Sequence, residues 1–118
     1  MAAPNIVNVT TITAKNALAT LITNTSNIIV NSASSSTVDK INYISIANYT
    51  ANSITANVMI NRSSVIYYLA GAITVPSNST LVVSGKDTSI YLEEGDILQA
   101  NVSANLSAHI TSSYEIIA

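Results

Sequence analysis

The sequence predicts an all-β protein, a single β-sandwich of about 8–10 short antiparallel strands with an immunoglobulin-like or jelly-roll arrangement. Isoleucine (17) and valine (10) outnumber leucine (7), and branched side chains pack well on a pleated sheet. Apolar and polar residues alternate at 54–61 and 98–104, which is the period of a strand. Turn-forming residues recur at short, even intervals, and the 118 residues are enough for about one domain.

The predicted strands follow the chain from one turn to the next. They lie at residues 6–13, 18–23, 27–31, 38–49, 54–62, 65–70, 80–84, 89–92, 97–104 and 107–117. Turns or loops separate several of them, at 32–37, 76–78, 85–87 and 93–96. The strand at 38–49 has apolar residues on both of its faces, which favours a central position in the sheet.

Residues 1–15 are expected to form an N-terminal arm or first strand that attaches the protein to a neighbour, and residues 16–118 the sandwich domain. No signal peptide is visible at the N-terminus. The longest apolar stretch, 65–75, is far shorter than the roughly 20 residues that span a bilayer. We therefore expect a soluble protein with no membrane partner.

The low charge excludes several classes of protein. Charged residues make up 8% of the chain and the net charge is −2; four scattered cations do not form the basic surface of a nucleic-acid-binding protein. The chain has no cysteine and one histidine, which excludes disulfides and thiolate or imidazole metal clusters. Lysine and proline usually protect edge strands from pairing with other sheets, and this chain has few of either. We therefore expect a homo-oligomer, and not a monomer; among oligomers a trimer is favoured.

His109 is the one side chain of the chain that titrates near neutral pH. A hydrolase would need it beside a serine and a carboxylate. By alternation it lies on the face opposite Ala108 and Ile110, without a local acid or nucleophile. We expect a surface or interface histidine and predict no catalytic residue.

The acidic turn around Gly95 has two interpretations. Glu93, Glu94 and Asp96 could offer oxygens to a hard cation such as calcium. Alternatively, glycine supplies a positive φ in a hairpin turn and the carboxylates are solvated. We favour the turn and predict no metal-binding or cofactor-binding residue.

Tyrosines and asparagines provide two weaker signals. Tyr67 and Tyr68 are adjacent, so they should point to opposite faces, one in the core and one exposed. Exposed tyrosines suit carbohydrate stacking or protein interfaces; the other four are Tyr43, Tyr49, Tyr91 and Tyr114. N-x-S/T triplets begin at Asn8, Asn24, Asn48, Asn61, Asn78, Asn101 and Asn105. In a chain so rich in these residues, the triplets carry no weight as glycan sites.

Three blocks of the sequence carry a resemblance. The first is 5–15 (NIVNVTTITAK), and the second is the serine-rich loop with the following strand, 31–48. The third comprises 75–83 (VPSNSTLVV), Lys86-Asp87, 90–96 (IYLEEGD) and 113–116 (SYEI). In these blocks the chain resembles a family of small β-rich virion structural proteins of tailed bacteriophages, especially those of marine and cyanobacterial hosts. It departs from that family chiefly between residues 54 and 71, where we expect a variable hairpin.

The resemblance implies a non-enzymatic virion protein that is assembled in the host bacterial cytoplasm. The leading role is a capsid decoration (cement) protein that stabilises the head by binding the major capsid lattice. The alternatives are a neck, tail or fibre-associated protein and a host-surface carbohydrate-binding module. The expected partners are other virion proteins and further copies of the chain, without nucleic acid or a cofactor.

Overall fold

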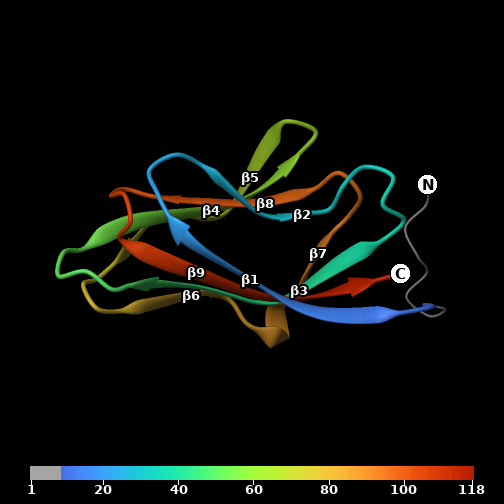
Figure 1. Cartoon of the computed structure of the whole chain (residues 1–118). Helices are drawn as coiled ribbons and strands as arrows, with labels where there is room; N and C mark the ends of the chain where they lie inside the picture. Colours follow the sequence, from blue (N-terminus) through green and yellow to red (C-terminus); the bar gives the residue numbers. More distant parts are fainter. Residues whose placement is uncertain (1–8) are drawn as a thin grey trace.

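The computed structural model describes residues 9–118, which fold into two antiparallel sheets packed face to face (Figure 1). The strands are β1 (Ile12–Leu21), β2 (Ser26–Val30), β3 (Val38–Asn48), β4 (Ile54–Arg62), β5 (Val65–Val75), β6 (Thr80–Ser84), β7 (Ile90–Leu92), β8 (Ile97–Val102) and β9 (Ala108–Ile117). One sheet has the order β1-β9-β3-β6, with β7 also paired to β3; the other has the order β2-β8-β4-β5. The predicted all-β sandwich is confirmed.

The pairing order is that of a jelly roll. β1 pairs with β9, β2 with β8, β3 with β6 and β7, and β4 with β5, all antiparallel. These pairs are nested, as in one long two-stranded ribbon, and the pairing of β3 with β9 and of β4 with β8 rolls the ribbon into two sheets. An immunoglobulin sandwich has a different strand order. Of the two predicted arrangements, the jelly roll is therefore the one the chain adopts.

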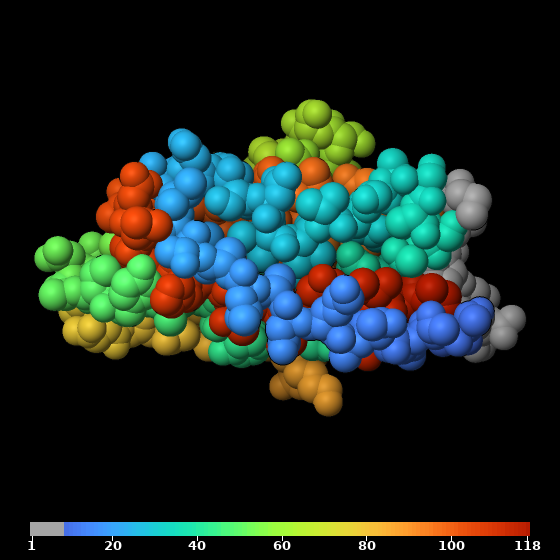
Figure 2. Space-filling model, viewed as in Figure 1, coloured from blue at the N-terminus to red at the C-terminus, as the bar shows by residue number. Residues whose placement is uncertain are grey.

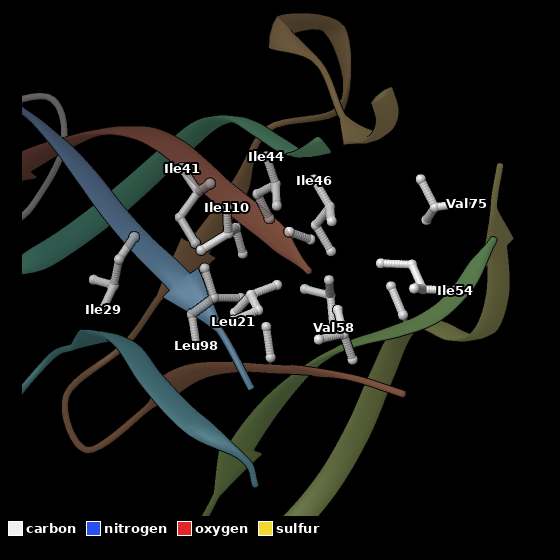
Figure 3. Close-up of a cluster of buried hydrophobic side chains, with 14 of the residues drawn as sticks. Leu21, Ile29, Ile41, Ile44, Ile46, Ile54, Val58, Val75, Leu98 and Ile110 are labelled. Atoms are coloured by element: carbon white, nitrogen blue, oxygen red, sulfur yellow. The ribbon is translucent and has the colours of Figure 1, made fainter. Parts of the chain in front are cut away.

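The core lies between the inner faces of the two sheets, where side chains of both meet (Figure 3). The predicted alternation holds in β8, where Leu98, Ala100 and Val102 are buried and the residues between them are partly exposed. β3 is central, with β9 on one side and β6 and β7 on the other, as predicted. Burial of the apolar core side chains away from water is the main contribution to the stability of the fold.

β1 is one strand where the sequence analysis predicted two, at 6–13 and 18–23. The polar pair Lys15 and Asn16, which suggested a break, lies exposed on an edge strand that pairs with β9 throughout. Asn16 accepts a hydrogen bond from the Ser113 hydroxyl at 2.8 Å. An exposed edge strand and a turn both leave their side chains in solvent, so both carry polar residues and look alike in sequence.

β5 and β8 also end at other positions than predicted. β5 continues past Ala70 to Val75 through an irregularity at Gly71 and Ala72. β8 ends at Val102 and not at residue 104. Leu106 lies in the following loop with φ of 56° and is 62% exposed.

The predicted attachment segment, residues 1–15, lies partly outside the described residues. Its last four residues belong to β1 and pair with β9. Just before β1, the Thr11 N–H donates to the Ala118 carbonyl at 3.0 Å and the Ala118 N–H donates to the Thr11 carbonyl at 2.9 Å. This end of the segment is thus paired within the sandwich, and its role in attachment stays a prediction.

The predicted turn at 85–87 forms a short 3-10 helix, η2 (Lys86–Thr88). Across residues 9–118, no helix has the length and apolar character needed to cross a bilayer.

Candidate interaction surface

The hairpin of β4 and β5 projects from the sandwich, and Figure 2 shows its yellow-green tip standing above the surface. Ser63 and Ser64 form the two-residue connection, with φ of 52° and 66°. Two positive φ values identify a type I′ turn, whose twist matches that of the flanking strands. The turn brings Arg62 opposite Val65 and sets the register of the hairpin. The hairpin expected within residues 54–71 is therefore present, and its variability stays a prediction.

β5 exposes apolar side chains on both of its faces. The exposed members are Val65 (50%), Ile66 (39%), Tyr67 (56%), Tyr68 (64%), Leu69 (36%) and Ile73 (40%). β5 has 11 residues, whereas β6 of the opposite sheet has five, so most of β5 has no opposing strand above it. The expectation that one of the two adjacent tyrosines is in the core is wrong for this reason.

The same segment carries no charge. No charged residue occurs between Arg62 and Lys86, so neither β5 nor β6 has an ionic side chain. Edge strands are usually protected by lysine, proline or inward charges. β1 has such a residue in Lys15, which is exposed. β5 therefore combines a free backbone edge with an uncharged apolar surface.

Arg62 ties the turn end of the hairpin to the acidic turn. Its Nε donates to Asp96 Oδ1 at 2.8 Å and its Nη2 to Asp96 Oδ2 at 2.6 Å. Nη2 also donates to Glu93 Oε2 at 2.8 Å. Burial alone would raise the pKa of Asp96, but hydrogen bonds from the Arg62 guanidinium and the Glu93 backbone N–H outweigh it and hold this pKa below its usual value. The projecting hairpin is thus held at one fixed point.

The acidic residues at 93–96 form the favoured turn, but the expectation that the carboxylates are solvated is wrong for Asp96, which is 1% exposed and bound by Arg62. Gly95 has φ of 88°, and the Asp96 N–H donates to the Glu93 carbonyl at 3.0 Å. The carboxylates serve separate protein partners, because Glu94 accepts the Ser36 N–H at 3.0 Å while the other two bind Arg62. Among residues 9–118, no group of three or more acidic or histidine side chains is arranged to hold a metal ion.

His109 lies on the outer face of the sheet, opposite the buried side chains of Ala108 and Ile110, as predicted. Its ring stacks on Tyr49 at a centroid distance of 4.5 Å. In the described chain it makes no hydrogen bond to a serine or a carboxylate, and its register neighbours are Thr20 and Ala47. The geometry that a Ser-His-Asp hydrolase needs is therefore not assembled around it.

The tyrosines do not gather on one face. Tyr67 and Tyr68 are on the projecting β5, Tyr91 is exposed on β7 in the other sheet, and Tyr114 packs against the core. Tyr49 sits at the opposite end of β4 from the hairpin turn, where its hydroxyl donates to the Leu106 carbonyl. No aromatic platform for a sugar results from this arrangement.

Two buried asparagines, Asn48 and Asn31, fix loops, and no pattern in the sequence predicted this role. The Asn48 amide donates to the carbonyls of Asn52, Val75 and Pro76 at 2.8, 3.0 and 3.1 Å, and its Oδ1 accepts from the Thr50 N–H and hydroxyl at 3.0 and 2.7 Å. The Asn31 amide donates to the carbonyls of Thr37 and Leu92 at 3.0 and 2.9 Å. Both side chains are 2% exposed. Because Asn48 is buried, its N-x-S/T triplet is closed to modification in the folded protein.

A row of polar groups crosses the outer face of the second sheet. The Asn101 amide donates to the Thr25 hydroxyl at 3.0 Å, and the Asn57 amide donates to Asn101 Oδ1 at 2.8 Å. Asn57 Oδ1 accepts the Ala72 N–H at 2.7 Å, at the irregularity in β5. These groups satisfy one another, so the row stabilises the β2-β8-β4-β5 sheet and the base of the hairpin.

Asp39 is a buried carboxylate in β3. It is 4% exposed and lies in register with Leu92 on β7 and Ile116 on β9. No salt bridge to it occurs in the described residues. Burial raises the pKa of Asp39 to about 6, because a low-dielectric environment disfavours the charged form.

A comparison of the sequence with models of known protein families gives no match, and a comparison with curated proteins gives no significant relative.

Proposed function

We propose that this protein is a structural protein of a bacteriophage virion, in the role of a capsid decoration (cement) protein that binds the major capsid lattice. The observation that carries an assembly role is β5, a long edge strand with apolar side chains exposed on both faces and no charge. Large exposed apolar patches mark sites of protein association. The resemblance of three sequence blocks to phage virion proteins is the reason for proposing a virion as that assembly.

The fold is compatible with this proposal at the level of analogy. Jelly rolls occur in viral capsid and lectin domains, but a fold alone does not define a function. The blocks that carry the resemblance fall mostly on β3, β6, β7 and β9, whereas the divergent residues 54–71 form the projecting hairpin. A common framework with a divergent hairpin is the arrangement expected where each family member recognises its own neighbour.

Co-sedimentation tests the proposal. The purified protein is mixed with expanded empty heads and, separately, with isolated tails of tailed phages from marine and cyanobacterial hosts. Saturable binding to heads at a fixed number of copies per capsid is the expected result. Binding to tails alone would overturn the decoration role in favour of a neck or tail position. Binding to neither, together with binding to host-surface polysaccharide, would overturn the virion proposal in favour of the carbohydrate-binding module.

A further inference from the structure

We propose that β5 pairs antiparallel with β5 of a second copy of this chain, about a two-fold axis at Tyr67, so that two four-stranded sheets join into one sheet of eight strands. This inference names the partner of the interaction surface and depends on the proposed function only through that surface. The Tyr67→Lys variant distinguishes a failure of the β5 pairing from a failure of the virion proposal.

The four sheet edges are not equivalent. β1 carries the exposed Lys15. β2 and β6 have five residues each, and β7 has three. β5 has 11 residues without a charge or a proline, and no strand of the described chain pairs with its outer edge. Free N–H and C=O groups along such an edge are a template for another strand, and β5 is the edge that offers them with least obstruction.

The sequence of β5 is compatible with pairing to itself. Residues that face each other across an antiparallel pair lie on the same face of the sheet, so a two-fold pair joins positions an even number apart. With the axis at Tyr67, this residue faces its own copy, Ile66 faces Tyr68, and Val65 faces Leu69. Aromatic and branched side chains form favourable cross-strand pairs. In β5 one register shift with β4 falls at Leu69, between Tyr68 and Ala70, and the other at Gly71 and Ala72, so the regular part of the pair comprises Ile66, Tyr67 and Tyr68.

Charge and area agree with a second copy as the occupant. Two copies of an uncharged strand have no like charges on the facing strands, and the nearest cation, Arg62, is already paired with Asp96 and Glu93. The exposed side chains of Val65–Leu69 set an upper limit of roughly 1,000 Å² on the area that two copies could bury, which is the size of a weak or transient interface. Tyrosine is enriched at such interfaces.

The proposed pair is closed. A two-fold contact uses the same surface on both subunits, so each free edge is covered and growth stops at the dimer. This stoichiometry differs from the trimer favoured in the sequence analysis, because a two-fold pair of β5 edges involves two copies. The mass in solution decides between them.

Single-cysteine variants test the register, since the chain has no cysteine of its own. Facing Cβ atoms in an antiparallel pair are about 4.5–5.5 Å apart, near enough for a disulfide after a small adjustment. Tyr67→Cys should form a covalent dimer on mild oxidation. Tyr91→Cys, at the 41% exposed tyrosine of β7, should form no disulfide-linked dimer under the same conditions. Equal cross-linking of the two variants would overturn the register, and a wild-type mass of a monomer or a trimer at all concentrations would overturn the pair.

A charge variant separates this inference from the proposed function. Tyr67→Lys places two ammonium groups face to face at the axis and should weaken the dimer by about tenfold or more, with an unchanged circular dichroism spectrum because Tyr67 is 56% exposed. Tyr91→Lys is the matched control and should leave the dimer intact. A Tyr67→Lys dimer as tight as wild type would overturn the pairing. Wild-type protein that dimerises but ignores heads and tails would refute the virion proposal and leave the pairing supported.

Discussion

Arg62, the last residue of β4, forms a two-point contact with Asp96, which lies just before β8 and is 1% exposed: Nε to Oδ1 at 2.8 Å and Nη2 to Oδ2 at 2.6 Å. The guanidinium also reaches Glu93. One arginine thereby compensates a buried carboxylate and fixes the turn end of the hairpin. The contact joins residues 34 positions apart in the sequence.

Removing the arginine should destabilise the protein. In Arg62→Met the Asp96 carboxylate stays buried without its cation, and the expected loss in free energy of unfolding is about 2–3 kcal/mol near neutral pH. Urea unfolding followed by circular dichroism measures it. The double variant Arg62→Met/Asp96→Asn should recover part of the loss, since no buried charge is left unpaired; full additivity of the two substitutions would contradict this explanation.

Acid should weaken the same contact. The pKa of Asp96 is lowered in the folded state, so its contribution to stability is present above the unfolded pKa of about 3.9 and is lost as the pH falls through the folded pKa. Unfolding free energies below pH 4 should converge for the wild type and Asp96→Asn. A difference that persists unchanged to pH 2 would show that ionisation of Asp96 is not the cause.

Asp39 should have the opposite pH dependence. Its pKa rises from 3.8 to about 6 on folding, so the unfolded state loses its proton first as the pH increases. The folded state therefore becomes less stable from about pH 4 through pH 6, by at most about 3 kcal/mol. Asp39→Asn should be more stable than wild type at pH 7.5 and nearly equal to it at pH 3.5. Denaturant titrations at both pH values provide the comparison, and equal stability at pH 7.5 would refute the prediction.

Asn48 is expected to be the most sensitive polar position. Asn48→Ala removes three donated and two accepted hydrogen bonds and leaves buried carbonyls without donors, at a cost of about 3 kcal/mol. Asn24→Ala, at an exposed asparagine, should change the stability by less than about 0.5 kcal/mol. Similar midpoints of thermal unfolding for both variants would be inconsistent with Asn48 fixing the loops around it.

The hairpin turn can be improved. Ser63 and Ser64 both have positive φ, which Asn-Gly adopts with less strain. Ser63→Asn/Ser64→Gly should raise the free energy of unfolding by about 0.5–1 kcal/mol. Ser53→Gly, at a position without a positive φ in the structure, should instead lower it slightly. A loss of stability in the double variant would mean that the turn is not type I′ in solution.

The sequence was informative where structure is local. Period-two alternation identified β4 and β8, and apolar residues on both faces identified the central β3. The break predicted near Lys15 was wrong because an exposed edge strand and a turn have similar polar sequences. The exposure of Tyr67 was missed because it depends on the length of β6, a strand in the other sheet.

The candidate site depended on long-range relationships that no short pattern encodes. The partners of Asn31, Asn48 and Arg62 come from segments up to 61 positions away. One signal in the sequence did point to the interaction surface. It was the absence of charge between Arg62 and Lys86, which is unusual for a segment that includes an edge strand.

Hydrogen exchange along β5 tests most directly whether this edge is occupied by another molecule. Backbone amides of Val65–Leu69 should become more protected as the protein concentration rises, because each new strand pair covers the free edge. Amides of β1, the other sheet's charged edge, provide the internal reference and should not change. Exchange of the β5 amides that is equally fast at low and high concentration would contradict the account, since an edge that never acquires a partner cannot hold an assembly together.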